Sequence, residues 1–212
     1  MTANEHTFDE IITSREQLRA IVGEPFDVVV NKSIDHIDDI CRRFIAASPF
    51  IMVATKGGNG LFDMSPKGDP AGFVEVLDDH TLAIPDRLGN KRHDTFENLL
   101  NNPEVGLFFL IPGNADTLRV SGTAKIVRDK ALQARLAVNG KEPEFVLIVT
   151  VKEAMTHCPK CVKRSRLWEP DKWPDRSDVP TLAEAMVVHA KLSESVDELQ
   201  ELIDEDGKKR LY

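Results

Sequence analysis

The residues best suited to chemistry form a basic turn at residues 87–92, which reads Arg-Leu-Gly-Asn-Lys-Arg. The turn places three cations and one glycine between a predicted strand and the start of a predicted helix. The first N–H groups of a helix are unpaired, its dipole is positive there, and arginine matches the geometry of phosphate oxygens. The turn therefore suits a phosphate-bearing ligand. The residues alone equally support a solvated loop whose cations pair with acids such as Asp86 and Asp94.

A second cluster of cations surrounds a Cys-x-x-Cys pair, Cys158 and Cys161, and ends at Trp168. Such a pair could be redox-active or form half of a zinc site, but no second Cys pair and no His pair at ligand spacing accompanies it. We therefore expect no metal and regard the thiols as incidental. Cations beside an indole could bind a phosphate and a flat ring together, and a solvated helix face is the alternative. The cations are Lys160, Lys163, Arg164 and Arg166.

Two further pairs of polar residues lie in or beside predicted strands. Arg119 and Ser121 alternate with apolar residues, so their side chains point to one face of the sheet. Ser65 and Lys67 border a predicted loop at the end of another strand. No Ser/His/Asp arrangement or paired carboxylates stand out, so no catalytic residue is predicted.

Composition limits the class of protein. The 212 residues are 42% hydrophobic and 29% charged, as in a globular chain, and the formal net charge of −8 argues against a nucleic-acid partner. No run of 18 apolar residues and no secretory leader pattern occurs. We expect a cytoplasmic protein with no membrane contact and with reduced thiols.

The first 46 residues predict helices. Ser14 and Gln17 form the Ser-x-x-Gln pattern of a capping box, which predicts a helix that starts near Arg15. Residues 28–30 are three valines and are predicted to be extended. Apolar residues at helical spacing over residues 34–45 predict a second helix that ends at Ser48-Pro49.

Residues from about 50 to 152 predict short strands joined by hairpin turns. The predicted strands cover residues 50–54, 61–65, 73–77, 81–84, 105–111, 117–127 and 145–151. Asp94 is expected to cap a helix that Asn102-Pro103 ends, and residues 130–138 predict another helix. Because few helices separate the strands, the pattern favours an antiparallel barrel or sandwich.

The remaining residues predict a linker around Trp173 and one or two helices over residues 181–203. Their apolar positions suit burial against the body or a partner subunit. The whole chain, residues 1–212, is thus expected to be one domain. It would comprise N-terminal helices at 8–46, a barrel at about 50–152 and a C-terminal segment at 153–212.

Several ordered motifs resemble one family. The motifs are Ile84-Pro85-Asp86-Arg87-x-Gly89-Asn90-x-Arg92, Asn98-Leu99-Leu100-x-Asn102-Pro103, Gly106-Leu107-x-Phe109-x-Ile111-Pro112-Gly113, Thr117-Leu118-Arg119-Val120-x-Gly122, His157-Cys158-x-Lys160 and Arg164-Ser165-x-Leu167-Trp168. In this order they resemble the split-barrel FMN-binding proteins related to pyridoxamine 5′-phosphate oxidase, in a mostly uncharacterised bacterial branch. The resemblance spans about residues 34–176, and several motifs in order are more specific than any one.

The resemblance implies a mainly β fold, a six-stranded antiparallel split β-barrel with peripheral helices and a C-terminal helical segment. It implies a homodimer with FMN at the subunit interface. The cofactor would contact Ile84, Pro85 and Asp86, and the residues that follow them, Arg87, Asn90, Lys91 and Arg92, would hold its phosphate. The isoalloxazine would lie along Met64, Ser65, Pro66 and Lys67. The ring or ribityl chain would meet Thr117, Arg119 and Ser121, and the second subunit would supply Arg164, Ser165, Leu167 and Trp168.

The resemblance implies an FMN-binding oxidoreductase that acts on an unknown small molecule. The phosphate motif differs from that of the oxidase itself, because Asn90 replaces a serine, the order is Lys91-Arg92, and the Arg-x-His substrate signature is missing. Oxidation of pyridoxamine phosphate is therefore not expected. Two alternatives stay open: a non-catalytic flavin carrier or sensor, and a split barrel that holds a deazaflavin cofactor or heme.

Overall fold

The computed structural model describes residues 6–212, which divide into a unit that ends at Ser33 and a unit that spans Ile34–Tyr212. The first unit holds helices α1 (Arg15–Val22) and α2 (Asp27–Val30). The predicted capping box is present, since Ser14 accepts from the N–H of Gln17 and the Gln17 side chain accepts in return. The predicted extended valines are instead helical in α2, because an acid in the first turn starts one short turn despite their β-branched side chains.

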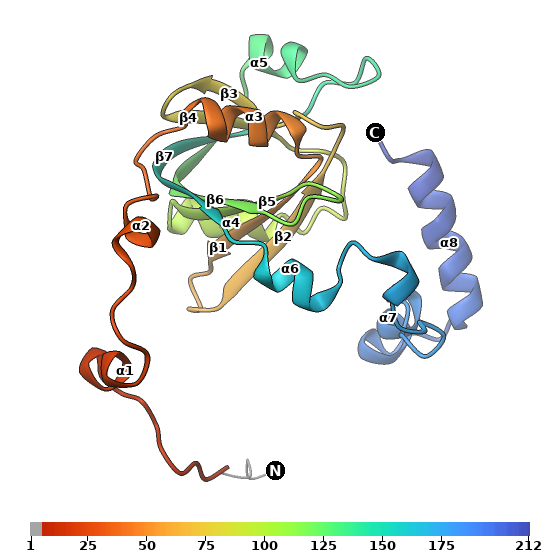
Figure 1. The fold of residues 1–212 in the computed structure, drawn as a ribbon. Coiled ribbons are helices and arrows are strands. Elements are labelled where there is room, and N and C mark those ends of the chain that lie inside the picture. The colour runs from red at the N-terminus through yellow and green to blue at the C-terminus, as the bar shows by residue number, and fades with distance from the viewer. Residues whose placement is uncertain (1–5) are drawn as a thin grey trace. The chain divides into compact units, whose positions relative to one another are not determined.

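The second unit is built on one antiparallel sheet of seven strands in the order β2-β1-β5-β6-β7-β4-β3. Figure 1 shows the strands curving around a shared interior. The end strands β2 and β3 do not pair with each other within residues 6–212. The mainly β, antiparallel class is confirmed, with seven strands instead of six because the short β3 adds an edge. The strands are β1 (Phe50–Lys56), β2 (Phe62–Gly68), β3 (Glu75–Asp78), β4 (Thr81–Pro85), β5 (Glu104–Leu110), β6 (Thr117–Val127) and β7 (Val146–His157).

Long-range pairing lengthens two strands beyond their predicted ends. Strand β2 pairs with β1 as far as Gly68, so Pro66 and Lys67 lie in a strand and not in the predicted loop. Strand β7 continues to His157, six residues past the predicted end, because β6 pairs with it throughout. A register shift between Ser121 and Gly122 accommodates this long pair of strands.

Strand β2 is an edge strand whose two faces differ in burial. Asp63, Ser65 and Lys67 are partly buried on one face, whereas the alternate residues are exposed, Phe62 by 75% and Met64 by 61%. Pro66 lies within this strand. A proline cannot donate to a neighbouring strand and is tolerated at an edge, where its missing N–H faces outward.

Helix α3 (Asp39–Ala47) starts five residues later than its apolar spacing suggested. Asp38 accepts from the N–H of Cys41 at 2.8 Å and caps the helix, while Ile34 forms two backbone hydrogen bonds with Ala154 of β7. The helix buries Cys41 and Ile45 in the main core. That core also holds Ile51, Val53, Leu82, Ile84, Leu107, Phe109, Leu118, Val120 and Val149.

Helix α4 (Asp94–Asn101) packs against β1, β2 and β6. Its N-cap is His93, not Asp94 as predicted, and no side chain caps the helix. His93 is left-handed at φ 55°, so the chain turns sharply into the helix and Asp94 becomes its first residue. The other helices are α5 (Lys130–Arg135), α6 (Lys160–Ser165), the 3-10 turn η1 (Pro170–Lys172), α7 (Leu182–Ala190) and α8 (Val196–Lys209).

Candidate functional site: a cavity beside the basic turn

A cavity of about 560 Å³ lies beside the basic turn. The cavity is lined by residues 63–68 of β2, by Phe73, by the chain from Pro85 to His93, by the first turn of α4, and by Leu211 and Tyr212. This volume falls within the range of small-molecule sites. Two of the elements that form it are the edge strand β2 and the end of β4, which is next to last at the other end of the strand order.

Residues 63–68 of β2 all line the cavity, and the alternation of the strand divides them between two faces. Asp63, Ser65 and Lys67 share the partly buried face. Asp63 accepts a hydrogen bond from Thr95 Oγ1 of α4 at 3.0 Å, and Lys67 Nζ lies 3.4 Å from Asp86 Oδ1. Lys67 Nζ also lies 6.0 Å from the centre of the Phe96 ring. The Lys67 side chain thus lines the cavity, pairs with Asp86 and is 22% exposed.

Arg87 is held by protein groups. Its Nε donates to Asp69 Oδ2 at 2.5 Å and its terminal nitrogen donates to the Leu136 carbonyl at 2.9 Å. The Arg87 side chain is 17% exposed and the Asp69 side chain is fully buried. This pair fixes the first residue of the turn, and the predicted partner Asp86 binds Lys67 instead.

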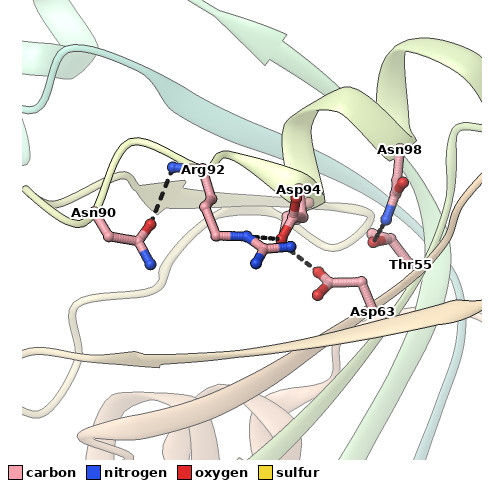
Figure 2. Close-up of polar contacts among 7 residues, drawn as sticks. Thr55, Asp63, Asn90, Arg92, Asp94 and Asn98 are labelled. Atoms are coloured by element: carbon pink, nitrogen blue, oxygen red, sulfur yellow. Dashed lines mark hydrogen bonds and ion pairs between the residues drawn. The ribbon is translucent and has the colours of Figure 1, made fainter. Parts of the chain in front are cut away.

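Arg92 is an exposed cation of the turn, with 73% of its side chain accessible. Figure 2 shows its guanidinium between Asp94 and Asp63, with a hydrogen bond of 2.7 Å to Asp94 Oδ2. The hydrogen bond with Asp94, and the charges of Asp94 and Asp63, raise the pKa of Arg92. Asn90 Oδ1 accepts from the Arg92 N–H at 3.0 Å and closes the turn.

The backbone of the turn is constrained around Lys91 and His93, whose φ angles are 64° and 55°. Non-glycine residues seldom adopt this left-handed region. The Lys91 side chain is exposed and makes no hydrogen bond or ion pair within residues 6–212. Beneath the turn, the His93 ring stacks on Phe96 with centroids 5.4 Å apart, and Phe145 meets both rings edge-on. Three packed aromatic rings thus lie at the end of a turn that carries two exposed cations.

A second cavity of about 520 Å³ lies on the other side of the turn. The two cavities share part of the turn and Tyr212 as a common wall. Tyr212 Oη donates to Asp69 Oδ1 at 2.8 Å, and this hydrogen bond is the main cause of a raised pKa of Tyr212. The second cavity is completed by Lys141, Glu142, Pro143, Glu144, Phe145 and Arg210.

The structure brings together one group of the residues predicted for the site. The first cavity is lined by Met64, Ser65, Pro66, Lys67, Pro85, Asp86, Arg87, Asn90, Lys91 and Arg92. Ile84 is 2% exposed and packs in the core, so it supports the turn without reaching the cavity.

The other predicted residues line neither cavity in one copy of the chain. On β6, Thr117 is buried and its Oγ1 has no hydrogen-bond partner among residues 6–212. Arg119 donates to Glu153 at 2.9 Å, and its buried Nε has no partner in the same range. Trp168 Nε1 donates to the Asn114 carbonyl at 2.7 Å. Ser121 is partly buried, and Arg164, Ser165 and Leu167 are exposed.

Sequence reasoning missed several residues of the cavity. Asp63 could have been found, because it alternates with Ser65 and Lys67 along β2. Leu211 and Tyr212 carry no local signal, since only the path of the chain after α8 brings them to the turn. Among residues 6–212, no group of three His, Cys, Asp or Glu side chains is placed to hold a metal ion. The described helices include none with the length and apolar character needed to cross a membrane.

Comparisons with solved structures find chains of low identity. HupZ of Group A Streptococcus is 21% identical over 56% of this chain and 91% of its own, with a TM-score of 0.47. A protein related to general stress protein 26, from Clostridium acetobutylicum, is 20% identical over 54% and 83%, with a TM-score of 0.40. An FMN-binding protein from Syntrophomonas wolfei is 14% identical over 68% and 94%, with a TM-score of 0.45.

A search of curated proteins finds no match. The family model described as pyridoxamine 5′-phosphate oxidase matches residues 37–158, more than half of the chain, from the residue before the cap of α3 through the sheet to the end of β7. The chain therefore belongs to the pyridoxamine 5′-phosphate oxidase family.

Proposed function

We propose that this protein is a flavoprotein that binds FMN in the cavity beside the basic turn. The observation that carries the proposal is the placement of Lys91 and Arg92, two exposed cations, beside the start of α4 in a cavity of about 560 Å³. Family membership supports the same assignment. The unpaired N–H groups and positive dipole of a helix start add to the attraction for a phosphate.

The two arginines would have different roles, Arg87 in the shape of the turn and Arg92 in contact with the phosphate. Arg87 is already satisfied by Asp69 and Leu136, so it would hold the turn in shape. Arg92 pairs only with exposed or partly exposed carboxylates, and such pairs contribute little stability. The guanidinium of Arg92 could therefore exchange Asp94 for a phosphate at small cost.

The rest of the proposed site requires a second copy of the chain. Buried polar atoms in proteins almost always have a hydrogen-bond partner, yet Thr117 Oγ1 and Arg119 Nε have none within the described part of one copy. A homodimer with FMN at its interface would give these atoms a ligand or a partner chain to contact. It would also bring Arg164, Ser165, Leu167 and Trp168 of one copy toward the cavity of the other.

A bound flavin would supply hydride and single-electron chemistry, so the protein needs no side-chain nucleophile. We propose an oxidoreductase that acts on a small molecule. Lys67, which lines the cavity and pairs with Asp86, would donate a hydrogen bond to the ring. Ser65 lies on the same face of β2 and is partly buried.

The experiment that tests the proposal is a titration of the apo protein with FMN and, separately, with riboflavin. Binding is measured by the quenching of flavin fluorescence. FMN should bind more tightly than riboflavin, because only FMN carries the phosphate that the turn would hold. Protein that takes up neither flavin, or that does not distinguish them, contradicts the assignment. Stopped-flow reduction of the loaded protein by NAD(P)H then separates an enzyme from a carrier, which should be reduced slowly or not at all.

A further inference from the structure

The chain after α8 returns to the basic turn. Helix α8 ends at Lys209, and the next residues reach both cavities: Leu211 lines the first, Arg210 lines the second and Tyr212 lines both. Lys141 also donates to the backbone carbonyl of Tyr212. Two independent contacts, one from the side chain and one from the backbone, thus hold Tyr212 in place.

Tyr212 and Arg87 share one buried carboxylate. Asp69 accepts from Tyr212 Oη with one oxygen at 2.8 Å and from Arg87 Nε with the other at 2.5 Å. The Asp69 side chain has no solvent exposure, so these donors replace the water that a carboxylate normally binds. The phenol of Tyr212, Asp69 and the guanidinium of Arg87 thus form one series of hydrogen bonds.

We propose that Tyr212 is a positioning residue of the ligand site, which orients the basic turn through Asp69 and Arg87 and closes the phosphate end of the cavity. This proposal rests on the proposed binding of FMN. Tyr212 is half-buried and Leu211 is 68% exposed, so both side chains present surface that a ligand in the cavity could cover. The ligand class is that of the proposed function, a ring-bearing compound with a phosphate at the turn.

The chain offers a direct probe of this residue, because Tyr212 is its only tyrosine. Protein labelled with 3-fluorotyrosine gives a single ¹⁹F resonance. Titration with FMN should shift this resonance with the dissociation constant measured by flavin fluorescence. A resonance that stays fixed while FMN binds overturns the proposal for Tyr212 and leaves the proposed function intact. A wild-type chain that takes up no FMN overturns both.

Two variants test the positioning role. Tyr212→Phe removes only the hydroxyl and should weaken FMN binding about three- to tenfold, the effect of losing one ordinary hydrogen bond, with riboflavin binding unchanged. Lys209→Ala is the matched control, because it removes an exposed ion pair in the last turn of α8 and lines neither cavity. If Tyr212→Phe lost the same affinity for FMN and for riboflavin, Tyr212 would only contact the ligand, and the positioning role would be overturned. Unchanged FMN affinity would overturn that role as well.

Discussion

Replacing Arg87 by alanine should lower the stability of the fold, whereas replacing Arg92 by alanine should weaken FMN binding, although the two residues lie in the same turn. Arg87 is 17% exposed and its partner Asp69 is fully buried. Removing one partner of a buried ion pair strands the other charge and typically costs about 3 to 5 kcal/mol. Tyr212 would still donate to Asp69, which favours the lower end, about 3 kcal/mol.

A loss of this size is easily measured by urea denaturation. Chains of this class have slopes of about 2 kcal/mol per molar urea, so Arg87→Ala should lower the unfolding midpoint by about 1.5 M. Adding Asp69→Asn removes the stranded charge and should recover part of the loss, as a double-mutant cycle would reveal.

Arg92→Ala should leave the unfolding midpoint unchanged, because the guanidinium is 73% exposed. It should weaken FMN binding about ten- to a hundredfold, the effect of losing a charge-assisted contact to phosphate. Arg128→Ala is the control, since it removes another exposed arginine that lines neither cavity. An Arg87→Ala midpoint equal to wild type would refute the structural role of Arg87, and an Arg92→Ala variant with normal FMN affinity would place the phosphate elsewhere.

Three further changes test the fold. Gly122→Ala should destabilise the chain by about 3 kcal/mol or more, because its Cβ would lie 2.0 Å from the Thr150 carbonyl oxygen of β7; a normal melting temperature would contradict this reading. Asp38→Ala should cost about 1 kcal/mol, or about 3 °C in melting temperature, by removing the cap of α3, whereas Asp38→Asn should retain most of it. Burial, followed by contact with Asp38, raises the pKa of Cys41 to about 11 from 9.0. The folded chain then keeps a proton that the unfolded chain loses, so stability should fall from pH 9 toward 11, and less so in Cys41→Ala.

The sheet was largely predictable because its strands carry a local signal. Apolar runs bounded by glycine and proline marked β1, β4 and β5 close to their observed limits. Strand ends were less predictable, since β2 and β7 are extended by pairing with β1 and β6, which are distant in sequence. The prediction for the three valines of α2 was wrong in type, because these β-branched residues were expected to be extended and form a helical turn.

The candidate site was predictable to the extent that it is continuous in sequence. The basic turn could be found from its own residues, but the roles of its cations could not. Arg87 is held by Asp69, 18 residues earlier, and by Leu136, 49 residues later. Tyr212 is 143 residues from Asp69. Contacts at these separations depend on the whole topology and leave no spacing pattern to detect.

The proline in β2 has a consequence for behaviour at high concentration. An edge strand with exposed Phe62 and Met64 offers both apolar side chains and open backbone groups, the combination that promotes aggregation between sheets. Pro66 removes one donor from the middle of that edge, so a strand from a neighbouring molecule could not pair along its full length. Pro66, which borders the cavity, therefore also protects the protein against edge-to-edge aggregation of its sheet.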